Sequence, residues 1–170
     1  MKRIKAIVKG IDTFSEWWGK IFSWFIIGLT ALSCYEVFTR RILGKPTIWT
    51  HEILSYLFCG TVMLIIGYAQ LHKDHVNVDL LYHRLSPKRK AILDIITYII
   101  FMGAFCGVFL VNGIIFAKTS WAMAERTPSA FNFIVYPAKT MIPVGAFILT
   151  LQLISGFMKR VVFLVKGEQL

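Results

Sequence analysis

The chain has 170 residues, of which 56% are hydrophobic and only 16% are charged. A soluble domain of this length can bury a core with far less apolar sequence, and the apolar residues here fall in long blocks, which is typical of a protein that crosses a membrane several times. The net charge of +10 is the kind of value seen in nucleic-acid-binding proteins. Lysine and arginine nevertheless cluster at the ends of the apolar blocks, which favours membrane topology and argues against a nucleic-acid partner.

Residues 1–20 predict an amphipathic helix rather than a span. Apolar side chains recur every three or four residues, and the basic side chains fall mostly between them. The apolar stripe is formed by Ile4, Ile7, Ile11, Phe14, Trp18 and Ile21. We expect the helix to lie in the membrane interface; the alternative is a basic tail that only enforces orientation. The membrane-interface anchors would be Lys2, Arg3, Lys5, Lys9, Trp17 and Trp18.

Four apolar segments predict an all-α membrane protein with four transmembrane helices in a single domain of residues 1–170. The segments are 21–39, 48–71, 91–117 and 140–158. At about 1.5 Å per residue the third would cover roughly 40 Å, more than the ~30 Å of the hydrocarbon core, so it should tilt or project. Residues 118–139 mix aromatic and polar side chains and predict either a partly re-entrant segment or a surface loop.

The distribution of lysine and arginine predicts that both termini are cytoplasmic. Thirteen of these residues lie in the N-terminal segment, in the connection after the second span and in the C-terminal tail, against six in the other two loops. Cytoplasmic segments carry the excess of positive charge in membrane proteins.

Charged residues gather where the first span ends and the second begins. Glu36 and Arg40 are four residues apart with the acid first, which is the favourable order for an ion pair on a helix. Glu52 enters the second span at a similar depth, which predicts an interhelical Arg40–Glu52 pair. The alternative is that Glu52 binds a coupling cation or a proton, but acids of that kind usually lie near the middle of the bilayer.

Two polar residues belong to the third span. Asp94 lies one turn inside it, and we expect a salt link with the basic cluster at 88–90. Asn112 is deep in the span, where its amide could form a hydrogen bond across helices.

Nothing in the sequence predicts catalysis, a metal or a cofactor. It contains no nucleophile–base set, no phosphate-binding glycine loop and no metal signature. His51 is the one histidine within the predicted spans, so a haem is not expected. Cys34, Cys59 and Cys106 all sit inside apolar blocks and are interpreted as reduced packing residues.

The order of polar residues between positions 40 and 79 resembles the small membrane subunit of tripartite ATP-independent periplasmic (TRAP) transporters. The residues that carry the resemblance are Arg40, Pro46, Trp49, Glu52, Gly67, His75 and Asp79. In the family an arginine ends the first span, Trp-x-Glu-Glu-Leu opens the second, and His-x-x-x-Asp lies in the connection. Here His51 replaces the first glutamate of the pair, so Glu52 is the one acid that carries over. Pro137 and the segment 143–146 also resemble the family's entry to its last span.

The resemblance implies a non-catalytic role in transport. In such systems a soluble periplasmic protein captures an organic acid, typically a C4-dicarboxylate, a sugar acid or sialic acid. A large membrane subunit holds the substrate and sodium sites and moves like an elevator, while the small subunit packs against its static scaffold in the bacterial inner membrane. The implied partners are the large subunit, as a heterodimer, the periplasmic binding protein and membrane lipids. The implied structural or interface residues are Glu36, Arg40, Trp49, Glu52, Gly67, His75 and Asp79.

Two other functions fit the sequence less well. A stand-alone dimeric four-helix exporter would need a carboxylate well inside a span, whereas Glu36 and Glu52 both lie near the ends. A haem-carrying membrane anchor of an oxidoreductase would need paired histidines within the spans.

Overall fold

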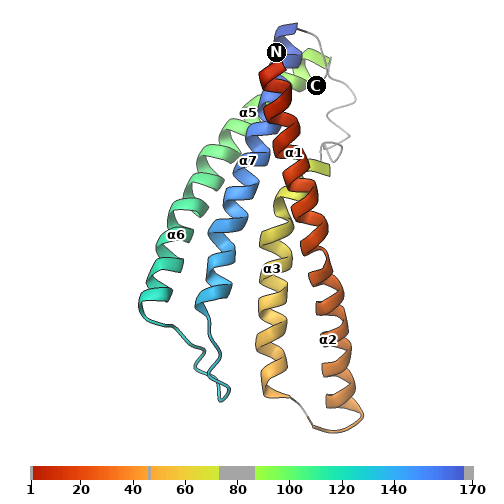
Figure 1. Cartoon of the computed structure of the whole chain (residues 1–170), viewed down its shortest axis with the longest axis vertical. Helices are drawn as coiled ribbons and strands as arrows, with labels where there is room; N and C mark the ends of the chain where they lie inside the picture. The colour runs from red at the N-terminus through yellow and green to blue at the C-terminus, as the bar shows by residue number, and fades with distance from the viewer. Residues whose placement is uncertain (1, 46, 73–86, 167–170) are drawn as a thin grey trace.

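The computed structural model describes residues 2–45, 47–72 and 87–166. These residues form long helices that run along one axis, which confirms the all-α fold (Figure 1). The elements are α1 (Lys2–Phe22), α2 (Trp24–Arg41), α3 (Ile48–His72), α5 (Pro87–Ile100), the π-helix η1 (Phe101–Cys106), α6 (Gly107–Ala122) and α7 (Tyr136–Lys166). The start of α1 and the end of α7 lie at one end of the molecule, here the terminal end. The α2–α3 turn and the loop 123–135 lie at the other, here the loop end (Figure 1).

Three helical stretches among the described residues are long and apolar enough to cross a membrane. They are Arg3–Arg41, which combines α1 and α2, then Ile48–His72 and Tyr136–Val165. The second predicted span, 48–71, matches α3 almost to the residue, and α7 extends the predicted fourth span at both ends.

The predicted third span, 91–117, is not one regular helix. It is divided among α5, η1 and α6, and α6 is an apolar helix shorter than the three stretches above. An α-helix turns by about 100° per residue. Asp94 and Gly113 are 113 − 94 = 19 residues apart, so on an uninterrupted helix they would point about 100° away from each other. Both face α7, because Asp94 pairs with Arg160 and Gly113 packs against Ile142. A π-helix has more residues per turn than an α-helix, so η1 changes the rotation along the chain and lets both residues face α7.

α7 contacts α1, α3, α5, η1 and α6, whereas α2 packs on α1 and α3. The contact between α7 and α3 depends on two glycines. A Cβ atom at Gly67 of α3 would lie 2.5 Å from Ile148 Cγ2, and a Cβ atom at Gly145 of α7 would overlap the backbone oxygen of Met63. Small residues at helix contacts are expected in a membrane, where lipid is as apolar as a leucine side chain and close van der Waals packing has to hold helices together.

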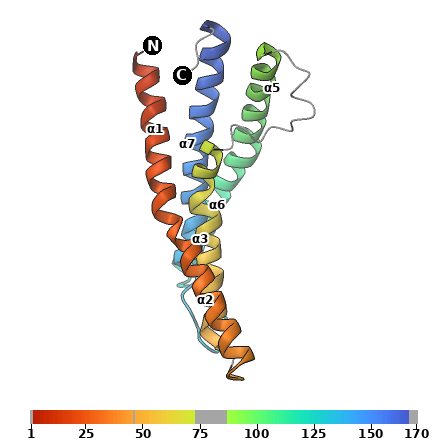
Figure 2. The ribbon, with the colours of Figure 1, turned by 90° about the vertical axis from the view of Figure 1, so that its right-hand side faces the viewer.

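The predicted N-terminal helix is present as α1. α1 runs beside α3 and α7 along the long axis of the molecule (Figures 1 and 2) and continues into α2 after a short irregularity at Ser23. The helix is therefore packed along the bundle, and its place in the membrane interface stays a prediction.

α1 buries a different stripe of side chains from the apolar stripe that its sequence shows. Val8, Ser15 and Gly19, spaced seven and four residues apart, are buried, and the Tyr68 side chain lies directly against Gly19. Much of the apolar stripe is exposed instead, at Ile4, Ile7, Phe14 and Ile21. Small side chains of α1 thus face the neighbouring helices, as is common where helices pack closely in membranes.

A polar cluster, here the Asp12 cluster, fastens α1 to α7. Asp12 Oδ1 accepts hydrogen bonds from Gln152 Nε2 at 3.0 Å and from Ser155 Oγ at 2.8 Å. Asp12 Oδ2 lies 2.8 Å from Lys159 Nζ, which neutralises the carboxylate. Gln152 and Ser155 are buried, so separation of the two helices would leave their polar groups without partners.

The predicted interface anchors occupy different environments on α1. The side chains of Arg3, Lys5 and Lys9 are exposed, as is that of Trp17. Trp18 is half-buried in a row of aromatic rings, with its ring centroid 5.6 Å from that of Phe14 and 4.7 Å from that of Phe22. The side chain of Lys2 lies outside the described part of the chain.

Replacing Gly67 by alanine tests the α3–α7 contact. The new methyl group would push α3 away from Ile148, and we expect a loss of about 1–3 kcal/mol of unfolding free energy, as for other overpacked sites. The matched control is Gly28→Ala, because a Cβ atom there would come no closer than 3.9 Å to Leu57. Thermal unfolding of both variants in detergent is the measurement, and equal stabilities would contradict the proposed role of the contact.

Candidate functional site

Glu36 is the first of two buried carboxylates at the loop end. Arg40 Nη2 donates to Glu36 Oε1 at 2.8 Å, which confirms the ion pair predicted from their spacing. Thr47 Oγ1 donates to Glu36 Oε2, and the Thr47 and Thr50 hydroxyls are themselves hydrogen-bonded. The carboxylate is therefore satisfied from both sides of the α2–α3 turn.

The turn that returns Thr47 to Glu36 has a local cause. Gly44 has a φ of +62°, a conformation that glycine adopts without steric cost. The Lys45 N–H donates to the Thr39 carbonyl at 3.1 Å, which closes the turn over the end of α2.

Trp49 lies in the first turn of α3, on the side of α2. Its ring centroid is 6.2 Å from that of Tyr35, and its side chain is half-buried. This contact joins the two helices at the level where tryptophan and tyrosine are enriched in membrane proteins.

Glu52 is the second buried carboxylate, and its side-chain partners come from the loop 123–135. Thr127 Oγ1 donates to Glu52 Oε1 at 3.0 Å, and Ser129 Oγ donates to the same oxygen. Glu52 Oε2 is buried and has no hydrogen-bond partner among the described residues.

The predicted Arg40–Glu52 ion pair is therefore wrong. Arg40 bonds to Glu36 on its own helix, and the Arg40 side chain is 61% exposed. Glu52 lies on the face of α3 that meets the loop 123–135, as Tyr56 shows one turn later by donating its hydroxyl to the Ile134 carbonyl. Arg40 pairs with Glu36 because this acid lies one turn earlier on the same helix. Glu52 bonds instead to hydroxyls of the loop 123–135.

The loop 123–135 joins the ends of α6 and α7 and packs against the first turns of α3 (Figure 1). Arg126 and Ile134 form an antiparallel bridge, and the Thr127 N–H donates to the Phe133 carbonyl at 2.8 Å. These bonds present the two hydroxyls that bind Glu52.

A salt bridge ties the same loop to α7. Lys139 Nζ donates to Glu125 Oε2, and the Val135 N–H donates to the Glu125 carbonyl at 3.0 Å. The hydrogen bond from Lys139 is the main reason that the pKa of Glu125 lies below its usual value. Glu125 therefore remains ionised at neutral pH and holds the start of the loop near the start of α7.

The structure brings only part of the sequence-predicted set together. Glu36, Arg40, Trp49 and Glu52 lie at the loop end. The polar contacts of Glu36 and Glu52 there are called the loop-end cluster, and its other members are Arg40, Thr47, Thr50, Thr127 and Ser129. Gly67 lies in the α3–α7 contact instead. His75 and Asp79 lie outside the described residues.

Sequence reasoning missed the hydroxyl donors that complete this cluster, namely Thr47, Thr50, Thr127 and Ser129. Serine and threonine are common in turns for local reasons, so their presence carries little signal. The available hint was that Glu36 and Glu52 both need buried partners while Arg40 can satisfy only one of them.

The loop-end cluster is suited to holding segments together. It joins the end of α2, the start of α3 and the loop 123–135 through carboxylate–hydroxyl bonds. Among residues 2–45, 47–72 and 87–166 no group of three His, Cys, Asp or Glu side chains is placed to hold a metal ion.

Comparison with known families gives a match that covers most of the chain. The family model described as "Tripartite ATP-independent periplasmic transporters, DctQ component" matches residues 29–162. The matched range includes the loop-end cluster, the α3–α7 contact and almost all of α7. No curated protein and no solved structure matches the chain.

Replacing Glu52 by alanine tests whether this carboxylate anchors the loop. Loss of hydrogen bonds to a charged acceptor is worth about 1.5–3 kcal/mol, so amide exchange in residues 123–135 should accelerate by about tenfold or more. Hydrogen–deuterium exchange is the measurement. Glu16→Ala is the control, because the Glu16–Lys20 pair is exposed on α1 and does not contact the loop. Unchanged exchange in the Glu52 variant would refute the anchoring role.

The Glu125–Lys139 pair predicts a defined pH dependence. Since the pKa of Glu125 is lowered in the folded chain, the pair stabilises the loop fully above the usual carboxyl pKa of about 4.5 and stops doing so as the pH falls through the lowered pKa. A carbon-13 NMR titration of labelled glutamates should show a higher Glu125 pKa in Lys139→Met than in the unmodified chain. Identical titration curves would contradict this assignment.

Proposed function

The chain belongs to the DctQ-component family of tripartite ATP-independent periplasmic transporters, and from this premise we propose that it braces the fixed scaffold of the large membrane subunit during sodium-coupled uptake of an organic acid. Family membership makes the chain the small permease subunit of an inner-membrane transporter and not an enzyme. The family works with a large membrane subunit and a periplasmic binding protein. The family match over residues 29–162 is the observation that carries the proposal.

The distribution of charge supports a bracing role over a transporting one. Residues 53–71 and 140–158 contain no Asp, Glu, Lys or Arg. Ionisable residues that bind ions or substrates in a membrane face the interior of the bundle or a water-filled cavity within the spans. Asp12, Glu36 and Glu52 instead bond to neighbouring segments near the two ends of the bundle.

The way that α7 is held also supports a fixed element. The Asp12 cluster ties α7 to α1 toward the terminal end, Glu125–Lys139 ties it to the loop at the other end, and Gly67 and Gly145 bring it close to α3. A transporter that moves like an elevator needs a part that stays in place while the other slides. A bundle fastened in this way suits the stationary part.

We further propose that the terminal end faces the cytoplasm and the loop end the periplasm. The excess of lysine and arginine in the segments at the terminal end supports this orientation. Arg3, Lys5 and Lys9 would then lie near the anionic lipids of the cytoplasmic leaflet, where each basic residue contributes about 1 kcal/mol of attraction. The loop-end cluster would lie on the side from which the binding protein delivers substrate.

The proposal predicts that transport needs this chain although the chain does not transport alone. Proteoliposomes with the large subunit and the binding protein should take up an organic acid on a sodium gradient only when the chain is also present. Radiolabelled succinate, a sugar acid and sialic acid form the panel, because the other two subunits would select the substrate. Full uptake without the chain would refute the bracing role, and uptake by the chain alone would favour the small-exporter alternative.

A further inference from the structure

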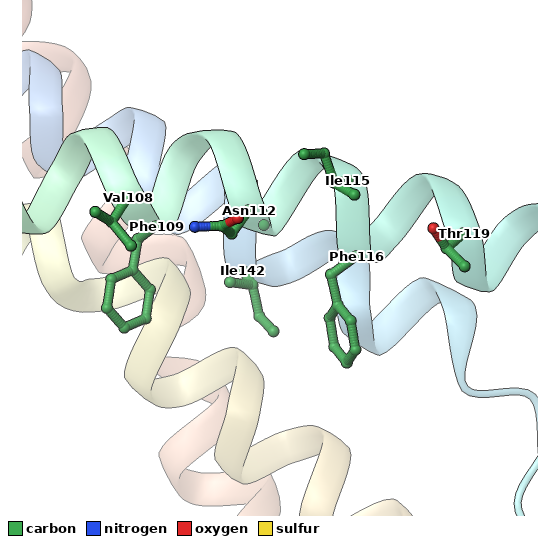
Figure 3. A pocket seen from close by; sticks show the side chains of 8 residues that line it. Val108, Phe109, Asn112, Ile115, Phe116, Thr119 and Ile142 are labelled. Atoms are coloured by element: carbon green, nitrogen blue, oxygen red, sulfur yellow. The ribbon is translucent and has the colours of Figure 1, made fainter.

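The side of α6 carries an apolar groove with one amide group in it. The groove is lined by α6 residues between Val108 and Thr119 and by Ile142 of α7 (Figure 3). Here it is called the α6 groove. Phe109 and Phe116, seven residues apart, point to the same side, and Asn112 lies between them along the helix (Figure 3).

Aromatic groups at the end of α6 indicate the depth that Asn112 would have in a bilayer. Trp121, at the end of α6, donates from Nε1 to Thr140 Oγ1 at 2.9 Å, and its ring centroid is 4.2 Å from that of Tyr136. Such aromatic groups mark the membrane–water interface. Asn112 precedes Trp121 by 121 − 112 = 9 residues, or about 13 Å of helix, which is close to half of a hydrocarbon core of ~30 Å.

The Asn112 amide is exposed at this depth and makes no hydrogen bond within the described residues. Two other exposed polar groups of the helices are satisfied within their own helix. The Thr30 hydroxyl donates to the Ile26 carbonyl, and the Thr97 hydroxyl donates to the Leu93 carbonyl. Gln152, the amide buried in α7, bonds to Asp12. Lipid chains offer Asn112 neither a donor nor an acceptor, so an amide left there is costly.

We propose that the α6 groove docks a helix of the large membrane subunit and that the Asn112 amide forms a hydrogen bond with a polar group of that helix. The identity of the partner rests on the proposed function. A transmembrane helix is the occupant that supplies both things that the groove needs, an apolar surface two turns long for the phenylalanine rings and a polar group at mid-depth. α2, at the opposite edge of the bundle from α6, then remains available to lipid (Figure 1).

Site-specific photo-crosslinking in membranes that contain the assembled transporter locates the docking face. A benzoylphenylalanine residue replaces Ile115 beside the groove in one sample and Val37 on α2 in the other, since both side chains are exposed and apolar. We expect an adduct with the large subunit at position 115 and none at position 37. An adduct at position 37 alone, or an adduct at position 115 with lipid or with a second copy of this chain, would overturn the inference.

The variant Asn112→Leu separates docking from folding. Because Asn112 has no partner within the described chain, thermal stability of the isolated subunit should stay the same or rise. Affinity for the large subunit should fall by about 3- to 30-fold, the worth of one interhelical hydrogen bond in a membrane, and Asn112→Gln should recover part of it. Thr30→Val on α2 is the control and should leave affinity unchanged. Unchanged affinity in Asn112→Leu, or a loss of stability without a loss of affinity, would overturn the inference.

Co-purification of the unmodified chain with the large subunit distinguishes a failure of the groove assignment from a failure of the proposed function. If the large subunit co-purifies while the results at Ile115 and Asn112 are negative, the groove assignment fails and the proposed function stands. If the large subunit does not co-purify at all, the proposed function itself fails.

Discussion

The close contact between α3 and α7 depends on two positions where a side chain would not fit. The absence of a side chain at Gly67 leaves room for Ile148, and its absence at Gly145 leaves room for the backbone of Met63. Because lipid does not drive apolar helices together, this short distance is what allows van der Waals packing to hold the centre of the bundle. It also fixes the start of α3 beside the loop that precedes α7, which brings Glu52 to the Thr127 hydroxyl. A larger side chain at Gly67 or Gly145 would therefore also disturb the contacts of Glu52 at the loop end.

Polar contacts also hold the helices together, and they lie away from the centre of the spans. The Asp12 cluster joins α1 to α7, and the loop-end cluster joins α2, α3 and the loop 123–135. Each carboxylate among the described residues bonds to a lysine, an arginine or a hydroxyl. Polar contacts at the two ends and, in α3 and α7, central stretches without a charged residue suit a supporting subunit.

The sequence predicted the helical fold, the second span and the Glu36–Arg40 pair, because these follow from hydrophobic blocks and from spacing along one helix. It could not predict partners that come from distant segments. Glu52 bonds to hydroxyls 75 and 77 residues away, and Asp12 bonds to residues more than 100 positions later. The N-terminal helix shows the same limit, since its apolar stripe was easy to recognise while the buried stripe through Val8, Ser15 and Gly19 becomes meaningful only beside α3 and α7. The π-helix at 101–106 leaves no pattern in the sequence at all.

Native mass spectrometry of this chain, extracted in mild detergent from its own membrane, is the decisive test of whether it is a transporter subunit. We expect a one-to-one complex with a much larger, many-span membrane protein. A homodimer of this chain with no larger partner would refute the subunit role and favour a stand-alone exporter.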